Sequence, residues 1–298
     1  RTARMEYFSY LVATGISTGA LYALVALGIV VIYKATKVVN FAHGEMFMLG
    51  GFFAYTFHVM LGWPYIPSFL LAVALAFALG LAVDRIAFRP LMQRQNMVSM
   101  LLCMIGLSFV LKGLARWLWG GKGDYLTFPP LVSPTPLNFG GIMVMSQQLV
   151  VLGGACLVML VFALFFKFTR AGRFMQATAD NPKAAKLVGL RTDLVYMYTF
   201  GVGAAVAAAA AVLMAPLTLL YPDIGFMLFI KAFAAAVLGG LTSILGAVVG
   251  GFLIGLIEQM SAGYIHTSMQ EVAAFIVIMV VLVFIPTGLF GQRGSRKV

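Results

Sequence analysis

The most chemically unusual string in the sequence is Asn40-Phe-Ala-His-Gly-Glu45, which brings a histidine and a carboxylate to the start of an apolar run. Ionisable groups beside hydrocarbon are costly, and they usually face the interior of a helix bundle or a water-filled path. Asn40, His43 and Glu45 are therefore candidates for a gate, a pathway lining or a conformational latch. The competing interpretation is a polar helix cap at the inner membrane interface, because Asn40 is a favourable N-cap and Glu45 in a first turn suits the helix dipole.

The glycine pair Gly239-Gly240 is a second candidate for the pathway or gate. It interrupts an apolar run over residues 226–257, which is too long for one membrane crossing of about 20 residues. Irregular backbone at membrane depth is tolerated only where protein or water satisfies its polar groups. We therefore expect this break to face the interior of the bundle.

A third candidate is a basic segment over residues 172–193, which predicts an amphipathic helix. Asp180 or Asn181 can cap it, and Pro182 suits the first helical position. One interpretation is a helix lying on anionic lipid; the other is a docking knob for a cytoplasmic partner. The residues of the knob would be Pro182, Lys183, Ala184, Ala185, Leu187, Val188 and Gly189, with Lys186 and Arg191 beside the apolar face.

The sequence lacks the residues that nucleotide binding, metal binding or a disulfide would need. Gly121-Lys122 is no phosphate-binding loop, because such a loop needs glycine where Arg116 stands and serine or threonine where Gly123 stands. No histidine or cysteine pair has metal-ligand spacing, and Cys103 and Cys156 both fall in apolar runs, which disfavours a disulfide. We expect a protein that is not an enzyme and binds no metal or cofactor itself.

The composition indicates that this fold is surrounded by lipid and not by water. Hydrophobic residues make up 62% of the chain and charged residues 10%, whereas soluble domains carry about 25% charged residues. Strands of a membrane β-barrel would alternate polar with apolar residues, and the apolar runs here do not. The sequence therefore predicts an all-α fold, a polytopic transmembrane helical bundle that forms a single domain over residues 1–298.

About eight apolar segments are visible, near residues 9–33, 41–61, 65–83, 97–119, 147–166, 194–220, 226–257 and 271–290. Basic residues favour the cytoplasmic side, so the stretches 84–94 and 167–193 and the C-terminal Arg293, Arg296 and Lys297 should lie inside. The net charge of +11 follows from these loops and does not indicate nucleic-acid binding. The proline-rich connection 120–146, with Lys122, Asp124 and Pro134, should be an ordered extracytoplasmic loop.

Counting the crossings gives a further prediction. Three apolar runs lie between two inside segments, the loop 167–193 and the C-terminus, and three full crossings cannot join two points on one side. The run 226–257 should therefore be a re-entrant pair that enters and leaves on the outer side. This places Glu258, His266 and Glu271 outside. Lys34 and Lys37 put the N-terminus outside as well, against the weaker opposing signal of Arg1 and Arg4.

Several strings, in order from about residue 9 to residue 293, resemble the permeases of Liv-type ABC importers for branched-chain amino acids, and the LivH-type subunit in particular. They are Tyr22-Ala-Leu-Val-Ala-Leu-Gly28, Val39-Asn-Phe-Ala-His-Gly-Glu-Met46, Lys231-Ala-Phe-Ala-Ala-Ala-Val-Leu-Gly-Gly240 and Ile285-Pro-Thr-Gly-Leu-Phe-Gly291. The stretch Lys183-Ala-Ala-x-x-x-Gly189 is similar to the coupling motif of ABC permeases, with lysine in place of its acidic first residue.

The resemblance implies an importer subunit of a bacterial inner membrane. Such a permease pairs with a second, homologous permease of the LivM type, two ATPase subunits bind beneath it, and an extracytoplasmic binding protein delivers the substrate. ATP and Mg would be used by the partner subunits, and residues 169–193 would form the coupling loop.

Two alternatives stay open at this point. The same architecture could import urea, short amides or small aromatic acids. A self-contained channel or secondary transporter is the other alternative, and it predicts a buried carboxylate at mid-membrane. Glu45 is the one acid that the sequence places near the centre of a span, which weighs against this alternative.

Overall fold

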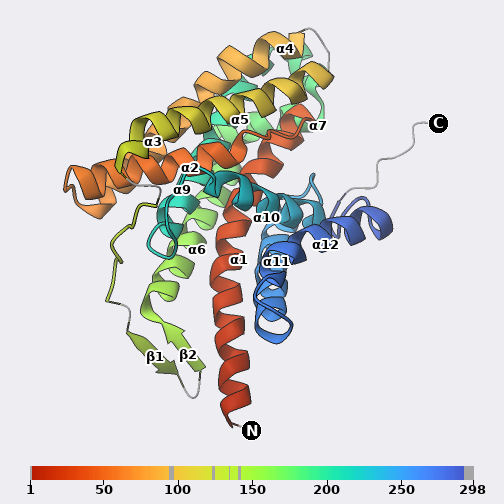
Figure 1. Ribbon diagram of the computed structural model, residues 1–298. Coiled ribbons are helices and arrows are strands. Elements are labelled where there is room, and N and C mark those ends of the chain that lie inside the picture. The colour runs from red at the N-terminus through yellow and green to blue at the C-terminus, as the bar shows by residue number, and fades with distance from the viewer. Residues whose placement is uncertain (1, 94–96, 123–124, 134, 140–141, 292–298) are drawn as a thin grey trace.

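The computed structural model describes residues 2–93, 97–122, 125–133, 135–139 and 142–291 (Figure 1). Of the residues used above to orient the chain, Arg1, Arg94, Asp124, Pro134, Arg293, Arg296 and Lys297 lie outside this part. The α-helices are α1 (Thr2–Thr36), α2 (His43–Tyr55), α3 (Tyr65–Val83), α4 (Arg89–Gln93), α5 (Met97–Trp119), α6 (Ser146–Phe168), α7 (Arg170–Asp180), α8 (Pro182–Leu187), α9 (Thr192–Met214), α10 (Ile224–Gly239), α11 (Ile244–Tyr264) and α12 (Met269–Phe284).

The predicted all-α membrane fold is confirmed. Six helices of the described chain are long and apolar enough to cross a membrane, and α10 and α12 are shorter apolar helices. The π-helical turns Thr56–Met60 and Asp84–Phe88 continue α2 and α3. Strand β1 (Pro136–Phe139) pairs antiparallel with β2 (Ile142–Met145) in the loop that the sequence predicts to be extracytoplasmic. This hairpin was not expected from the sequence.

Helix α1 forms the axis of the molecule, and small residues allow its close approach to α11. A Cβ added at Gly15 or Gly19 would press on the backbone of α11, and one added at Gly251 would press on Ala23. Short side chains let helix backbones come this close, which maximises van der Waals contact where no hydrophobic effect drives association. Gly15 and Gly19 of α1 and Gly251 and Gly255 of α11 therefore form one close interface.

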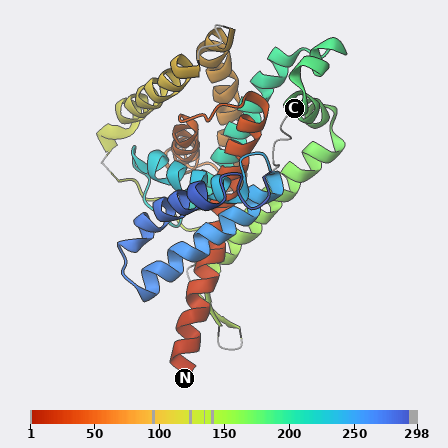
Figure 2. The ribbon, with the colours of Figure 1, turned by 90° about the vertical axis from the view of Figure 1, so that its right-hand side faces the viewer.

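The long apolar run 226–257 is divided into α10 and α11, as the sequence predicts. Gly240 has a φ of +102°, a backbone conformation that favours glycine, and Ser243 caps α11 by accepting a hydrogen bond from the amide of Gly246 at 3.0 Å. The two helices pack against each other, so the run forms a helix hairpin. Figure 2 shows α11 running from the centre of the molecule toward the N-terminal end of α1.

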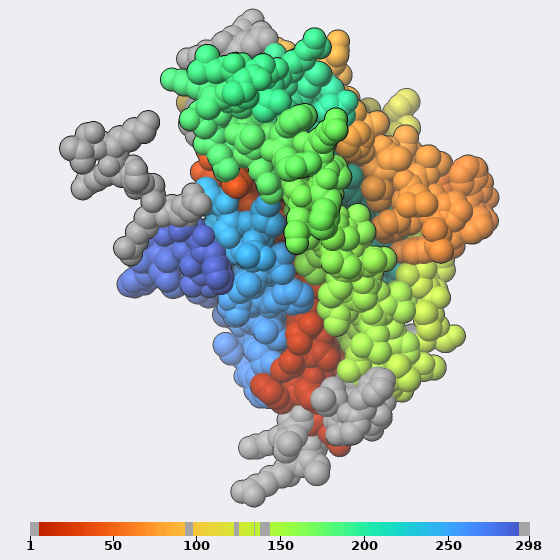
Figure 3. Space-filling view, turned by 180° about the vertical axis from the view of Figure 1, so that it is seen from behind, coloured from red at the N-terminus to blue at the C-terminus, as the bar shows by residue number. Residues whose placement is uncertain are grey.

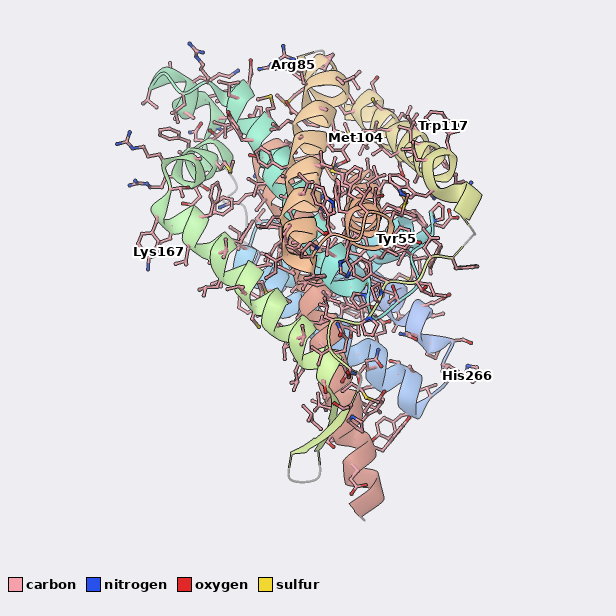
Figure 4. The ribbon with its side chains drawn as sticks, turned by 90° about the vertical axis from the view of Figure 1, so that its left-hand side faces the viewer. Tyr55, Arg85, Met104, Trp117, Lys167 and His266 are labelled. Carbon is pink, nitrogen blue, oxygen red and sulfur yellow. The ribbon has the colours of Figure 1, made fainter. Side chains whose placement is uncertain are left out.

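Ion pairs and contacts define two ends of the bundle. At one end Lys34 of α1 lies 3.4 Å from Asp180 of α7, and Arg89 of α4 lies 3.3 Å from Asp193 of α9. At the other end the hydroxyl of Tyr7 donates to the carbonyl of Gly263 at 3.1 Å. Figure 4 shows Arg85 at the end that carries α7 and His266 in the opposite half. The loops that include Arg89 and Asp180 therefore lie at the same end of the bundle, and the side of the membrane that this end faces stays a prediction.

Candidate functional site

The segment before α2 turns back into the protein, so that α2 begins in the interior. Lys37 makes the turn with a φ of +60°, and the side-chain oxygen of Asn40 accepts a hydrogen bond from the amide of Ala42 at 3.0 Å. The prediction that Asn40 is the N-cap is therefore wrong, since the N-cap is Ala42 and the helix begins at His43. Asn40 instead stabilises the turn before the helix by an Asx-type hydrogen bond.

His43 and Glu45 point into the bundle and not toward lipid. Their exposed fractions are 0% and 1%. A Cβ added at Gly28 of α1 would stand 2.6 Å from Nε2 of His43, so the imidazole occupies the space that this glycine leaves open. The position expected from the cost of desolvation is thus observed, and an interfacial cap does not describe these residues. Their part in a pathway stays a prediction.

Glu45 begins a chain of charged contacts that joins α2, α5 and α10. Ser108 donates to Oε1 of Glu45 at 2.9 Å, and Nζ of Lys112 lies 4.0 Å from the same oxygen. Lys112 in turn lies 3.0 Å from Asp223, whose other carboxylate oxygen accepts from Arg116 at 2.7 Å. Ser108, Lys112 and Arg116 are four residues apart on α5, which puts them on one face of the helix.

Asp223 precedes α10 at the exposed end of this network. Partial burial raises the pKa of its carboxyl group, but the hydrogen bonds and charges of Lys112 and Arg116 outweigh this effect and hold the pKa below the ordinary value of 3.8. Asp223 is therefore ionised at neutral pH, and two cations converge on it. This network was not expected from the sequence, because Glu45, the α5 residues and Asp223 belong to three segments at least 63 residues apart that meet only when α5 and α10 pack beside α2.

A cavity of about 450 Å³ opens beside Arg116 and Asp223. Four aromatic residues line it: Phe52, Trp119, Tyr125 and Tyr221. Its walls are held by an antiparallel bridge in which Leu126 and Leu220 exchange backbone hydrogen bonds of 2.8 and 2.9 Å. It lies at the end of α5 that is distant from α7, because α5 begins just after α4 and ends at Trp119.

A second ion pair lies within the helix hairpin. Lys231 of α10 donates to Glu258 of α11 at 2.6 Å, and the Lys231 ammonium also lies 5.7 Å from the centre of the Tyr22 ring. Glu258 is 1% exposed. The prediction that Glu258 lies outside is therefore wrong: α11 extends to Tyr264, so residue 258 is inside the helix and faces α10. Glu45 is thus not the one acid within the bundle.

Gly239 and Gly240 are buried and serve a close backbone contact. A Cβ at Gly239 would meet the carbonyl of Gly246 across the hairpin. The end of α10 receives hydrogen bonds from the segment after α12: Leu289 donates to the carbonyl of Leu238 at 2.8 Å and Phe290 to that of Gly239 at 3.0 Å. Two of the strings that carry the family resemblance are thus in contact, and the described cavities do not have these glycines in their walls.

Helices α7 and α8 form the predicted cytoplasmic projection. Asn181 caps α8 by accepting a hydrogen bond from the amide of Ala184 at 3.0 Å, and Pro182 follows at the first helical position, as expected. Leu187 and Val188 are 88% and 77% exposed. Figure 3 shows this region, in green, as a mass at the top of the molecule.

The apolar face of the projection differs from the predicted one at two positions. Ala185 is 4% exposed and packs inward, because α7 and α9 cover that side of α8. Gly189 is exposed and has a φ of +84°, so its role is to end α8 in a conformation that favours glycine. Large residues at Ala185 or Gly189 would disturb this fold, whereas Ala184, Leu187 and Val188 are free to meet a partner.

The comparisons with known proteins agree with this architecture. The family model for the permease component of branched-chain amino acid transport systems matches residues 11–285. The LivH permease of the high-affinity branched-chain amino acid transport system of Escherichia coli (strain K12) is 34% identical over 98% of both chains. BraD from the corresponding system of Pseudomonas aeruginosa is 34% identical over 98% of this chain and 99% of its own.

More distant proteins are also similar. The autoinducer 2 import permease LsrC of Yersinia enterocolitica is 28% identical over 68% of this chain and 56% of its own. Among solved structures, PsaBC from Streptococcus pneumoniae in complex with Fab has the same fold, with a TM-score of 0.50, 14% identity and coverage of 95% and 92% of the two chains. The family model and the full-length similarity to LivH and BraD together show that this multi-pass membrane protein belongs to the family of branched-chain amino acid transport permeases and is a permease subunit of an importer.

Proposed function

We propose that this permease imports branched-chain amino acids in an ATP-driven complex. In that complex it pairs with a second, homologous permease of the LivM type, two ATPase subunits bind below, and an extracytoplasmic binding protein delivers the substrate. Support comes from the full-length similarity to LivH and BraD, whose names state this substrate class. ATP and Mg are used by the ATPase subunits, and this chain holds no cofactor of its own.

The observation that carries the coupling to an ATPase is the exposure of Leu187 and Val188. Two large apolar side chains that are 88% and 77% exposed stand at the tip of a basic projection. Side chains of this kind at a tip are well suited to fill a pocket of a partner, because a few buried apolar anchors supply most of the energy of an interface. Lys183 and Lys186, also exposed, would surround these anchors with positive charge.

The projection is connected to the centre of the bundle by a short series of contacts. Asp180, at the end of α7, forms an ion pair with Lys34 of α1 at 3.4 Å. Six residues earlier in α1, Gly28 packs against His43 at the start of α2. A displacement of α7 and α8 by an ATPase would thus reach the His43–Glu45 segment through α1, which is a physical route for coupling.

The test is a double charge substitution at the tip, Leu187→Asp with Val188→Asp, in the importer assembled from all its subunits. We expect the permease to insert and to keep its permease partner, but to lose the ATPase subunits on co-purification and to lose uptake of radiolabelled leucine. The matched control is Val132→Asp, an exposed apolar residue in the opposite loop, which should leave co-purification of the ATPase unchanged.

Two results would contradict the proposal. Unchanged ATPase binding by the double variant would remove the coupling role of α8 and leave it a helix on the lipid surface. Uptake of urea or short amides but not of leucine by the wild-type importer would remove the substrate assignment.

A further inference from the structure

We infer that the cavity beside Arg116 and Asp223 is a low-affinity subsite of the permease that takes the zwitterionic backbone of an amino acid. This inference rests on the proposed function and adds a ligand-binding site in this chain. The cavity has about 450 Å³ of space, and pockets for small ligands usually measure about 300–1,000 Å³. Its size thus suits a single small molecule.

The charges at the cavity are balanced, and both signs are available. Arg116 and Asp223 form an ion pair of 2.7 Å in the cavity wall, yet their side chains remain 60% and 50% exposed. Lys112 and Glu45 lie behind them, so that two cationic groups face two carboxyl groups. A guanidinium group binds a carboxylate through two parallel hydrogen bonds, and Asp223 can accept from an ammonium group.

The remaining wall suits an aliphatic side chain and a cation. Phe52 and Trp119 stack with their ring centres 5.0 Å apart, and Tyr125 and Tyr221 lie 5.5 Å apart. Aromatic faces give a large apolar contact area, and they also attract an ammonium group by cation–π interaction. The carboxylate, the ammonium group and the aliphatic side chain of one amino acid would therefore each contact a part of the wall that suits its charge or its polarity.

The same features disfavour uncharged ligands. Urea or a short amide could form hydrogen bonds with Arg116 and Asp223, but it carries no charges of its own to strengthen them and has little or no aliphatic part to contact the aromatic wall. The cavity lies at the end of the bundle distant from α7, beside the loop that the sequence predicts to be extracytoplasmic. It is placed to meet a substrate that arrives from outside.

The test uses protection of a cysteine from labelling in the assembled importer. Tyr125 lines the cavity and is 64% exposed, so Tyr125→Cys, in a background with Cys103→Ser and Cys156→Ser, gives a thiol at its mouth. A membrane-impermeant maleimide is added from outside with increasing L-leucine, urea or acetamide. We expect leucine to slow labelling in a saturable way and the uncharged compounds to leave the rate unchanged.

Two further compounds separate the roles of the charges. 4-Methylpentanoate lacks the ammonium group of leucine and 3-methylbutylamine lacks its carboxylate, so each should need a concentration at least about tenfold higher for equal protection. Arg116→Gln and Asp223→Asn should raise the half-protecting leucine concentration by a similar factor. In the double reversal Arg116→Asp with Asp223→Arg the ion pair is restored, but its reversed orientation should not restore protection.

The control is Val132→Cys, which is exposed in the same loop and does not line the cavity; leucine should not slow its labelling. If the wild-type importer takes up leucine but leucine leaves the Tyr125→Cys labelling rate unchanged, the subsite is overturned while the proposed function stands. If urea protects the thiol and leucine neither protects it nor is taken up, both the ligand class and the proposed substrate are overturned. Full protection after the double reversal would show that the pair is only structural and would also overturn the inference.

Discussion

Lys231 of α10 and Glu258 of α11 face each other across the helix hairpin, 2.6 Å apart at their charged atoms and 27 residues apart in the sequence. Glu258 is almost fully buried, and Lys231 keeps only 14% of its side chain exposed. The pair ties the two arms of the hairpin together at a depth where a single charge would be costly. The pair therefore predicts an order of stability among variants that lack one or both of its charges.

The single variants Glu258→Gln and Lys231→Met should be less stable than the double variant. Removal of one partner leaves a buried charge without compensation, which costs about 3–5 kcal/mol, whereas removal of both charges avoids this penalty. Thermal unfolding of the purified importer in detergent measures the order of stability. A Glu258→Gln single variant as stable as the wild type would show that the ion pair contributes little.

Gly44→Ala should separate α2 from α10. A Cβ at this position would meet the carbonyl group of Gly225, and backbone atoms cannot rotate away as a side chain can. We expect a lower melting temperature and loss of leucine uptake. The control is Gly106→Ala on α5, where a Cβ has nothing within 4 Å and alanine favours the helix by up to about 1 kcal/mol. Equal melting temperatures for the two variants would contradict the close contact.

Glu45→Gln should reduce transport more than expression. Glutamine keeps the size of the side chain and its hydrogen bond with Ser108, but it removes the attraction between residue 45 and Lys112, which lies 4.0 Å away in the wild type. Uptake rate per molecule of permease in the membrane is the appropriate measurement. A parallel fall in uptake and in the amount of membrane-inserted protein would indicate a purely structural role for Glu45.

The Asp223 network should contribute stability at neutral pH and lose it in acid. The folded-state pKa of Asp223 lies below its ordinary value of 3.8, so the ionised form stabilises the fold above the unfolded pKa, and the contribution disappears as the pH falls through the folded-state pKa. The melting-temperature difference between wild type and Asp223→Asn should be constant between about pH 8 and pH 5 and should shrink below about pH 4. A difference that grows with acidification would contradict the direction of the shift.

Cysteine labelling and tags should show that the two ends of the bundle lie on opposite sides of the membrane. Tyr264→Cys, next to the N-terminal end of α1, and a thiol at Val132 should react with an impermeant reagent added from outside. Leu187→Cys should react only after the membrane is permeabilised, as should tags in residues 172–189 and 287–298. Reaction of Tyr264→Cys only from the inside would contradict the re-entrant arrangement of α10 and α11.

The helices were predictable because each depends on local sequence. Apolar runs of spanning length, Asn181 followed by Pro182, and Gly239-Gly240 in an overlong run are read within a few residues, and all three correspond to elements of the structure. Segment 41–61 shows where this approach is incomplete. It has the length of a lipid-facing span, but α2 is buried on nearly every side, because its surroundings are set by α3, α5, α9 and α10.

The charged sites were less predictable for a related reason. Glu45 was identified by its unusual string, but its partners Ser108 and Lys112 come from a helix that is distant in sequence. Glu258 was misplaced because it lies near the end of an apolar run, and only the extent of α11 shows that it is inside the bundle. The inward direction of the Ala185 side chain was not predictable either. Helix α8 has only six residues, which is too short for the sequence periodicity to show which of its faces is covered.

The hydrogen bonds from Leu289 and Phe290 to the end of α10 have a bearing on how the protein is made. The carbonyl groups of Leu238 and Gly239 obtain their partners from residues about 50 positions later in the chain. During synthesis, α10 and α11 therefore enter the membrane before their turn can be completed. Closure of this turn must wait until residues 289 and 290 have left the ribosome, so a chain that stops short of them would leave these two carbonyl groups without their partners.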